Sequence, residues 1–199
     1  MAENLYVKSK LIAENLVVNE KDNLDIKIFR PSNIIQSYET GIFPYGITKD
    51  TLFKVNTELS ILNILAKNNV FVNINSPILD FSYVDETAKS IYKIMNVKDD
   101  TGYIYNVFNP NRISISEYAS MIGAKTLSIM DFEKYLIENE DTLSGDIKQL
   151  STLTIAEGNV NQALILSPEN IRTTNLLEQL GFKWHSLEKK NLDDIVKFK

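Results

Sequence analysis

The first third of the chain changes from a helical to an alternating pattern of apolar residues. Residues 4–19 place apolar side chains at helical intervals among polar ones, which predicts a helix of about four turns. Residues 24–30 then alternate apolar and polar side chains until Pro31 interrupts them, which predicts a strand. A loop is expected at residues 31–33. Residues 34–48 are expected to be irregular, because they combine two glycines and a proline with three Tyr or Phe side chains.

The rest of the chain continues to alternate between helical and strand-like patterns. Helical spacing predicts helices at residues 51–67, 86–95, 115–122, 170–180 and 192–198, and exposed helices joined by a loop at 131–146. Short apolar or alternating runs predict strands at residues 70–74, 103–108 and 163–166. This alternation indicates an α/β fold with a parallel sheet. The strands are fewer than a complete doubly wound sheet needs, so the pattern predicts only part of one.

Composition and charge exclude several classes of protein. With 44% hydrophobic and 24% charged residues, the chain has the composition of an ordinary folded protein, and its 199 residues suffice for one domain. The net charge of −5 argues against a nucleic-acid partner, which needs clustered Lys and Arg. Cysteine is absent and His185 is the single histidine, which excludes disulfides, thiolate sites and metal sites built on several imidazoles. No metal is therefore expected.

Membrane and secretion signals are also missing from the sequence. No apolar run approaches the roughly 18 residues of a membrane span. Residues 1–6 contain neither the basic nor the apolar region of a secretion signal. We therefore expect a cytoplasmic protein without a membrane partner.

The sharpest chemical signal is a tyrosine and a lysine on the first predicted helix. Tyr6 and Lys10 are four residues apart, so their side chains project from the same helical face. An ammonium group near a phenol stabilises the phenolate, which makes the hydroxyl a better proton donor to a developing alkoxide. The pattern Tyr-x-x-x-Lys also occurs by chance, and an exposed aromatic residue beside a solvated lysine is the simpler alternative.

Further motifs follow this pair in a defined order. Arg30, Pro31, Ser32 and Asn33 close the first predicted strand, and residues 80–85 read Asp-Phe-Ser-Tyr-Val-Asp before an apolar helix. The set resembles the extended short-chain dehydrogenase/reductase family, in which Tyr-x-x-x-Lys, an Arg-Pro-x-Asn strand end and a Val-Asp helix entry occur in this order.

Two later segments indicate which members of this family the chain resembles most. Residues 105–110 resemble an Asn-Pro strand end, and residues 176–184 are similar to a closing Leu-Gly-Phe-x-Trp segment. Both are features of the terminal thioester reductase domains of nonribosomal peptide synthetases and carboxylic acid reductases. Within the family, the chain therefore looks most like these domains.

The resemblance implies the C-terminal part of a Rossmann-like extended reductase with a mainly helical substrate-binding lobe, forming a single partial domain over residues 1–199. Residues 1–35 and 80–110 are expected to form the edge of the Rossmann sheet with the catalytic helix. Residues 36–79 and 111–199 are expected to form the lobe.

The nucleotide-binding half that the family carries is expected to be absent. In the family a Gly-rich phosphate turn and a catalytic Thr or Ser precede the tyrosine. This chain has seven glycines, and no three of them have the spacing of that turn. A fragment that is inactive in isolation is therefore expected.

The resemblance also implies roles for individual residues. Tyr6 is the expected proton donor, and Lys10 is expected to orient the ribose of NADPH and to tune Tyr6. The residues expected to lie against the nicotinamide are Pro31, Ser32, Asn33 and Ile34. The implied substrate is a peptidyl or acyl thioester on the phosphopantetheine arm of a carrier domain, reduced to an aldehyde or an alcohol.

Aromatic residues of the irregular segment offer a candidate substrate wall. Tyr38, Phe43 and Tyr45 are able to line an acyl or pantetheine channel, since ligand pockets are mostly apolar. Anchoring of the loop to the core is an equally good interpretation.

Other polar residues receive structural interpretations. Asp85 is expected to cap the helix that follows it, and Asp80 is expected to pair with a base or a backbone amide. Trp184 is expected to pack in the core, and His185 is assigned no role. The acidic residues 138–141 are expected to form a solvated face.

Two alternative functions stay open at this stage. The segment 80–85 equally suits a sugar-nucleotide epimerase or dehydratase, although such enzymes grip a diphosphate with basic residues and arginine occurs here only at positions 30, 112 and 172. The other alternative is a non-catalytic lobe that binds a carrier domain, or that self-associates through uncovered apolar faces and sheet edges.

Overall fold

The computed structural model describes residues 5–42, 57–75, 79–98, 102–143 and 169–191, apart from the side chains of a few residues at the starts of two helices. The strand predicted at 163–166 and the helix predicted at 192–198 lie outside these ranges. So do Phe43 and Tyr45.

Helices and strands alternate along the described chain. The helices are α1 (Leu5–Val18), α3 (Thr57–Lys67), α4 (Val84–Met95), α5 (Ile115–Ile122), α6 (Ile129–Glu138) and α9 (Ile171–Gln179). The strands are β1 (Ile28–Pro31), β2 (Asn33–Ile35), β3 (Phe71–Val72), β4 (Phe81–Tyr83), β5 (Ile104–Val107) and β6 (Thr126–Leu127). The predicted α/β class is confirmed.

The described strands form three parallel pairs, β1 with β5, β2 with β4 and β3 with β6. Each pair joins strands that are far apart in sequence, as parallel pairing requires, because the connection must cross back over the sheet. In the first pair Arg30 lies opposite Asn106. The carboxyl ends of β1 and β5 therefore lie at the same edge.

The sequence did not predict β2. A loop was expected at residues 31–33 and an irregular segment after it, but Asn33–Ile35 is a strand whose residues pair with Phe81–Tyr83. Three residues are too few to show a hydrophobic period, and the strand exists because β4 supplies its hydrogen-bond partners. The strand expected at 24–30 likewise begins only at Ile28.

Local signals explain where α5 begins and ends and where α9 ends. Ser114 and Glu117 form a capping box at the start of α5, and Gly123, at φ 74°, closes it in the left-handed conformation. Gly181, at φ 69°, follows α9 in the same way, and the amide of Phe182 turns back to the carbonyl of Leu177. Both helices match their predicted ranges to within one residue.

Two hydrophobic clusters hold these elements together. The larger cluster surrounds α3 and joins it to β2, β3, β4, α5 and α6. Its fully buried side chains include Leu59, Leu62, Phe71, Tyr118 and Phe132. The smaller cluster covers β5 with side chains from α4 and from the segment that starts at α9: Ile94, Tyr105, Val107, Leu177, Phe182 and Trp184.

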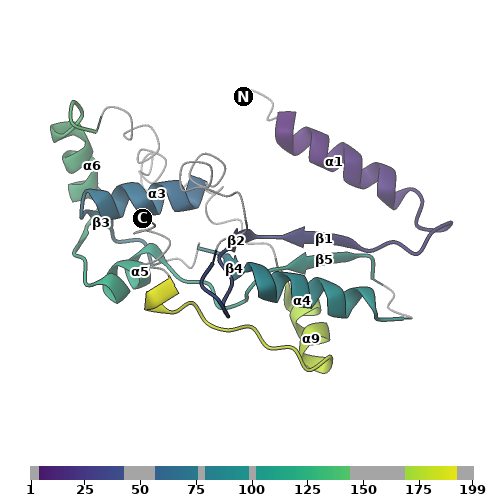
Figure 1. Cartoon of the computed structure of the whole chain (residues 1–199). Coiled ribbons are helices and arrows are strands. Elements are labelled where there is room, and N and C mark those ends of the chain that lie inside the picture. Colours follow the sequence, from purple (N-terminus) through teal and green to yellow (C-terminus); the bar gives the residue numbers. More distant parts are fainter. Residues whose placement is uncertain (1–4, 43–56, 76–78, 99–101, 144–168, 192–199) are drawn as a thin grey trace.

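Helix α1 stands apart from α4 and α9, across the β1–β5 pair (Figure 1). Its apolar side chains Leu5, Leu11, Ile12, Leu16 and Val17 are exposed. A salt bridge from Arg30 to Glu14 ties the helix to β1. Self-association through uncovered apolar surface stays a prediction, and α1 is one of the described elements that expose such side chains.

Candidate functional site

The predicted catalytic pair lies on α1. Tyr6 and Lys10 are one helical turn apart and so share a face, and Lys10 is exposed. The side chain of Tyr6 is outside the described part of the chain. Contact between the phenol and the ammonium group therefore stays a prediction.

An ion pair orients α1 relative to the end of β1. The Arg30 guanidinium donates two hydrogen bonds to the Glu14 carboxylate, one of them 2.9 Å long from Nε. The hydrogen bond from Arg30 lowers the pKa of Glu14, and the same contact raises the pKa of Arg30. Glu14 is one turn from Lys10, and Arg30 adjoins Pro31, so the ion pair connects the predicted catalytic helix to the start of the predicted nicotinamide loop.

The polar side chains of that predicted cofactor loop are bound to the β4 region. Ser32 Oγ donates to the carbonyl oxygen of Asp80 at 2.6 Å and lies 3.0 Å from Ser82 Oγ. Asn33 Nδ2 donates to Asp80 Oδ1 at 2.6 Å. Pro31 is exposed, whereas Ile34 is half-buried. A ligand at this edge would thus meet Pro31 and the backbone, while the side chains of Ser32 and Asn33 hold the strand end in place.

Asp80 is a half-buried carboxyl group. Burial raises its pKa, and the hydrogen bond from Asn33 and the charge of Arg112 oppose that rise only in part. Its side-chain partner is the Asn33 amide, so Asp80 acts as an anchor for the loop.

Asp85 does not cap α4, contrary to the sequence prediction. The N-cap residue is Tyr83, and it makes no side-chain capping bond. Asp85 lies in the first turn of the helix and accepts hydrogen bonds from the segment after β2: from Tyr38 N at 2.9 Å, Glu39 N at 3.3 Å and Ser37 Oγ at 3.1 Å. Burial opposes ionisation of Asp85, yet these hydrogen bonds hold its pKa below the usual range.

Replacing Asp85 by asparagine is expected to lower the free energy of unfolding by about 1–3 kcal/mol at neutral pH, because two amides and a hydroxyl lose their charged acceptor. The folded pKa lies below the ordinary value of 3.8, so the stabilisation is present above that value and is lost as the pH falls through the lower folded pKa. Chemical denaturation of both proteins at pH 7 and near pH 2 measures the difference. An equal difference at both pH values would contradict the assignment.

His185, which the sequence reading left without a role, lies beside Tyr38. Its Nδ1 is 2.5 Å from Glu86 Oε1, and its backbone N donates to the same oxygen at 3.2 Å. The imidazole stacks on the Tyr38 ring, with centroids 3.9 Å apart and planes 13° apart. Glu86 and His185 are 99 positions apart, so no local spacing in the sequence was able to indicate their contact.

Hydrogen bonds connect His185 to the predicted cofactor loop. Asn109 Nδ2 donates to the carbonyl oxygen of His185 at 2.6 Å, and Asn109 N donates to Ser82 Oγ at 2.8 Å. Ser82 Oγ in turn contacts Ser32 Oγ. Tyr38 and Ser32, predicted for substrate and cofactor respectively, are thus linked through a continuous set of contacts.

Tyr83 is a second tyrosine in this region, but it is a poor proton donor. Burial raises its pKa to about 12, so the phenol stays protonated at neutral pH. Its ring meets that of Tyr38 edge-on at 5.2 Å. Tyr83 therefore serves as packing for Tyr38.

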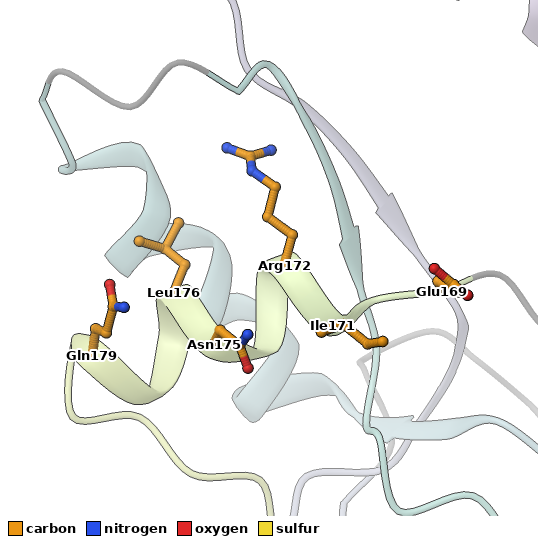
Figure 2. A pocket seen from close by; sticks show the side chains of 6 residues that line it. All are labelled: Glu169, Ile171, Arg172, Asn175, Leu176 and Gln179. Carbon is orange, nitrogen blue, oxygen red and sulfur yellow. The ribbon is translucent and has the colours of Figure 1, made fainter.

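A separate open hollow lies along α9 (Figure 2). It is lined by Glu169, Ile171, Arg172, Asn175, Leu176 and Gln179, and so includes none of the predicted site residues. The Arg172 guanidinium lies 5.1 Å from the centre of the Tyr105 ring, and Nη1 donates to the carbonyl oxygen of Ile104. The arginine thus supports β5.

The described residues form neither a metal-binding cluster nor a membrane-spanning helix. They contain no group of three or more His, Asp or Glu side chains placed to hold a metal ion. None of the helices in the described ranges combines the length and the apolar character of a membrane span.

Part of the chain matches a known protein family. Residues 1–91 match the model of an NAD-binding family described as male sterility protein, an extended short-chain dehydrogenase/reductase type. The matched region contains α1, the end of β1 and the start of α4. The resemblance to extended short-chain reductases is confirmed. None of the curated proteins matches the chain.

Solved reductase domains of the extended type share the fold. The thiolation-reductase di-domain of an archaeal non-ribosomal peptide synthetase has a TM-score of 0.72 at 22% identity, and the match covers 100% of this chain and 41% of that one. The aureusimine cluster reductase domain has a TM-score of 0.73 at 20% identity, covering 100% and 50%. The terminal R domain of the myxalamid pathway has a TM-score of 0.55 at 16% identity, covering 86% and 43%. The chain spans half or less of each of these structures.

Proposed function

We propose that the chain is the C-terminal portion of an NADPH-dependent thioester reductase that releases a carrier-bound peptidyl or acyl thioester as an aldehyde or alcohol. The observation that carries the proposal is the position of the Tyr6 and Lys10 helix. Glu14, one turn beyond Lys10, is bound to Arg30 at the end of β1, next to Pro31. This arrangement suits a proton donor and a ribose-binding lysine beside a nicotinamide.

The residues present fit one end of the proposed cofactor. Lys10 is exposed on the helix that carries Tyr6, and Pro31 offers an exposed apolar surface at the strand end. Ser32 and Asn33 would act through their backbone, because their side chains bind Asp80 and Ser82. The pyrophosphate end has no counterpart, because no group of glycines in the sequence has the spacing of a phosphate turn.

In the proposed reaction the cofactor is the source of the hydride and the protein is the source of the proton. When bound, NADPH would be the source of the hydride that the carbonyl carbon of the thioester accepts. Tyr6 gives its hydroxyl proton to the carbonyl oxygen as negative charge develops there, and Lys10 stabilises the resulting phenolate. The hemithioacetal would then return its hydroxyl proton to the Tyr6 phenolate as the C–S bond breaks, releasing the aldehyde and a carrier thiolate that takes a proton from water.

The arginines favour this proposal over a sugar-nucleotide enzyme. Arg30 is paired with Glu14, Arg172 lies over the Tyr105 ring, and Arg112 lies 5.4 Å from the centre of the Phe108 ring. Each guanidinium is thus engaged with the chain itself. A nucleotide diphosphate would need such groups turned toward it.

A carrier domain is the proposed partner. The archaeal structure with this fold is itself a thiolation-reductase di-domain, which supports a carrier as the source of the thioester. The predicted acidic face is a poor docking surface for it, because Glu138, Glu140 and Asp141 are exposed and carrier domains are themselves usually acidic.

The isolated chain is expected to be inert, because the cofactor would lack its pyrophosphate contacts. The test is oxidation of NADPH by the purified chain with an acyl thioester, followed by absorbance and by analysis of the aldehyde. No turnover is expected alone, and turnover is expected when a nucleotide-binding half with a Gly-rich turn is supplied. Rapid turnover by the chain alone would overturn the fragment interpretation.

A further inference from the structure

The strongest cluster that the proposed reaction does not use is formed by Glu86, His185 and Tyr38. Glu86 lies in the first turn of α4 and is only 4% exposed. A buried carboxylate is costly unless donors satisfy it. Among the described residues, the hydrogen bonds to this carboxylate come from His185 alone, through its backbone N and through Nδ1.

These bonds fix the orientation of the imidazole. Burial raises the pKa of Glu86, and the contact with His185 opposes that rise; when Glu86 is ionised it only accepts hydrogen bonds, and Nδ1 is then the donor in the short contact. With the backbone and the ring both held by one buried group, the ring plane has little freedom to rotate. That plane lies nearly parallel to the Tyr38 ring, at 13°.

Tyr38 is held from three directions. His185 covers one face of its ring, Tyr83 meets it edge-on, and Asp85 accepts a hydrogen bond from its backbone N. Asp85 and Glu86 are neighbours in the first turn of α4. That turn therefore binds the Tyr38 backbone directly and controls its ring through His185.

The cluster is also joined to the cofactor side of the site. Asn109 and Ser82 are both fully buried, and they connect the His185 carbonyl to Ser32 through hydrogen bonds of 2.6 to 3.0 Å. Movement of His185 would therefore disturb both the Tyr38 wall and the end of β1.

We infer that His185 is a positioning residue: Glu86 holds its ring so that the ring sets the Tyr38 side chain as a substrate-side wall, and its backbone carbonyl joins that wall to the Ser32 strand end. The substrate side of this inference rests on the proposed function. The positioning itself rests on the contacts alone.

Amide hydrogen exchange of the whole chain tests the positioning. His185→Phe keeps an aromatic ring but loses the donor to Glu86, and His185→Asn keeps a donor near the Nδ1 position but loses the stacked ring. Both variants are expected to accelerate exchange at the amides of Tyr38 and Glu39 by about tenfold, leaving the amides of α5 unchanged. Lys183→Ala, an exposed change in the same segment, is the matched control and should alter neither set.

Fluorescence of Trp184, the single tryptophan, shows in the same samples whether the smaller core cluster is intact. Unchanged exchange at Tyr38 and Glu39 in both variants would overturn the inference. Equal acceleration in α5 would also overturn it, because His185 would then only support the fold.

A second measurement separates this inference from the proposed function. Binding of S-hexanoyl-N-acetylcysteamine is followed through chemical shifts of the Tyr38 ring in the unaltered chain and in His185→Phe. If the thioester binds, the variant is expected to bind about fivefold more weakly, as loss of a positioning contact predicts. If the thioester does not bind the unaltered chain while exchange responds as expected, the proposed substrate fails and the positioning role stands.

Discussion

Replacing Tyr6 by phenylalanine is expected to lower the turnover of the reductase by about 10²- to 10⁴-fold, because the variant loses the hydroxyl that donates a proton to the carbonyl oxygen. The ring is retained, so packing on α1 should change little. The measurement is NADPH oxidation with an acyl thioester, made on the chain together with a nucleotide-binding half. The decrease should appear in kcat, because a proton donor acts in the transition state.

Tyr92→Phe is the matched control for this experiment. Tyr92 lies on α4 with 70% of its surface exposed, and it takes no part in the proposed site. Its variant should turn over at the unaltered rate. Full activity of Tyr6→Phe would remove the tyrosine from the mechanism and with it the central argument for a reductase of this type.

Leu62→Ala is expected to lower the free energy of unfolding by about 2–5 kcal/mol, because it leaves a cavity in the larger hydrophobic cluster. Leu62 is 1% exposed and lies on α3. Urea denaturation followed by circular dichroism measures the loss. Such a change is large beside the total stability of about 5–15 kcal/mol that is typical of a domain.

Leu11→Ala provides the comparison, since Leu11 is 57% exposed on α1 and the same atoms are removed from a solvated position. Its effect should stay within about 0.5 kcal/mol. Trp184 fluorescence reports on the smaller cluster in the same titrations. If the urea midpoints measured by circular dichroism and by Trp184 fluorescence differ in Leu62→Ala, the two clusters unfold separately.

Local sequence signals identified some elements well. The helix at residues 115–122 was predicted with its observed bounds. In the structure a capping box of Ser114 and Glu117 begins it and Gly123 ends it. The helix before Gly181 was predicted almost as closely. In these cases the information lies within a few residues of the element itself.

Elements that depend on distant partners were missed or misread. β2 is a strand only because β4 lies beside it, so residues 33–35 looked like a loop in the sequence. Asp85 looked like a helix cap because it precedes an apolar helix, but its acceptor oxygens are used by the Tyr38 segment, 47 positions away. A carboxylate at a helix start can either cap the helix or accept hydrogen bonds from another segment, and the position of that segment decides which of the two occurs.

The sequence alone determined the α/β class, the resemblance to extended short-chain reductases and the placing of Tyr6 and Lys10 on one helix, because period, caps and short motifs are local properties of the chain. Only the tertiary structure decided that Ser32 and Asn33 bind Asp80, and that His185 meets Glu86 and Tyr38. Those contacts depend on how distant segments pack. They affect stability because a buried polar group without a hydrogen-bond partner costs free energy, and only the fold decides which partner lies near it.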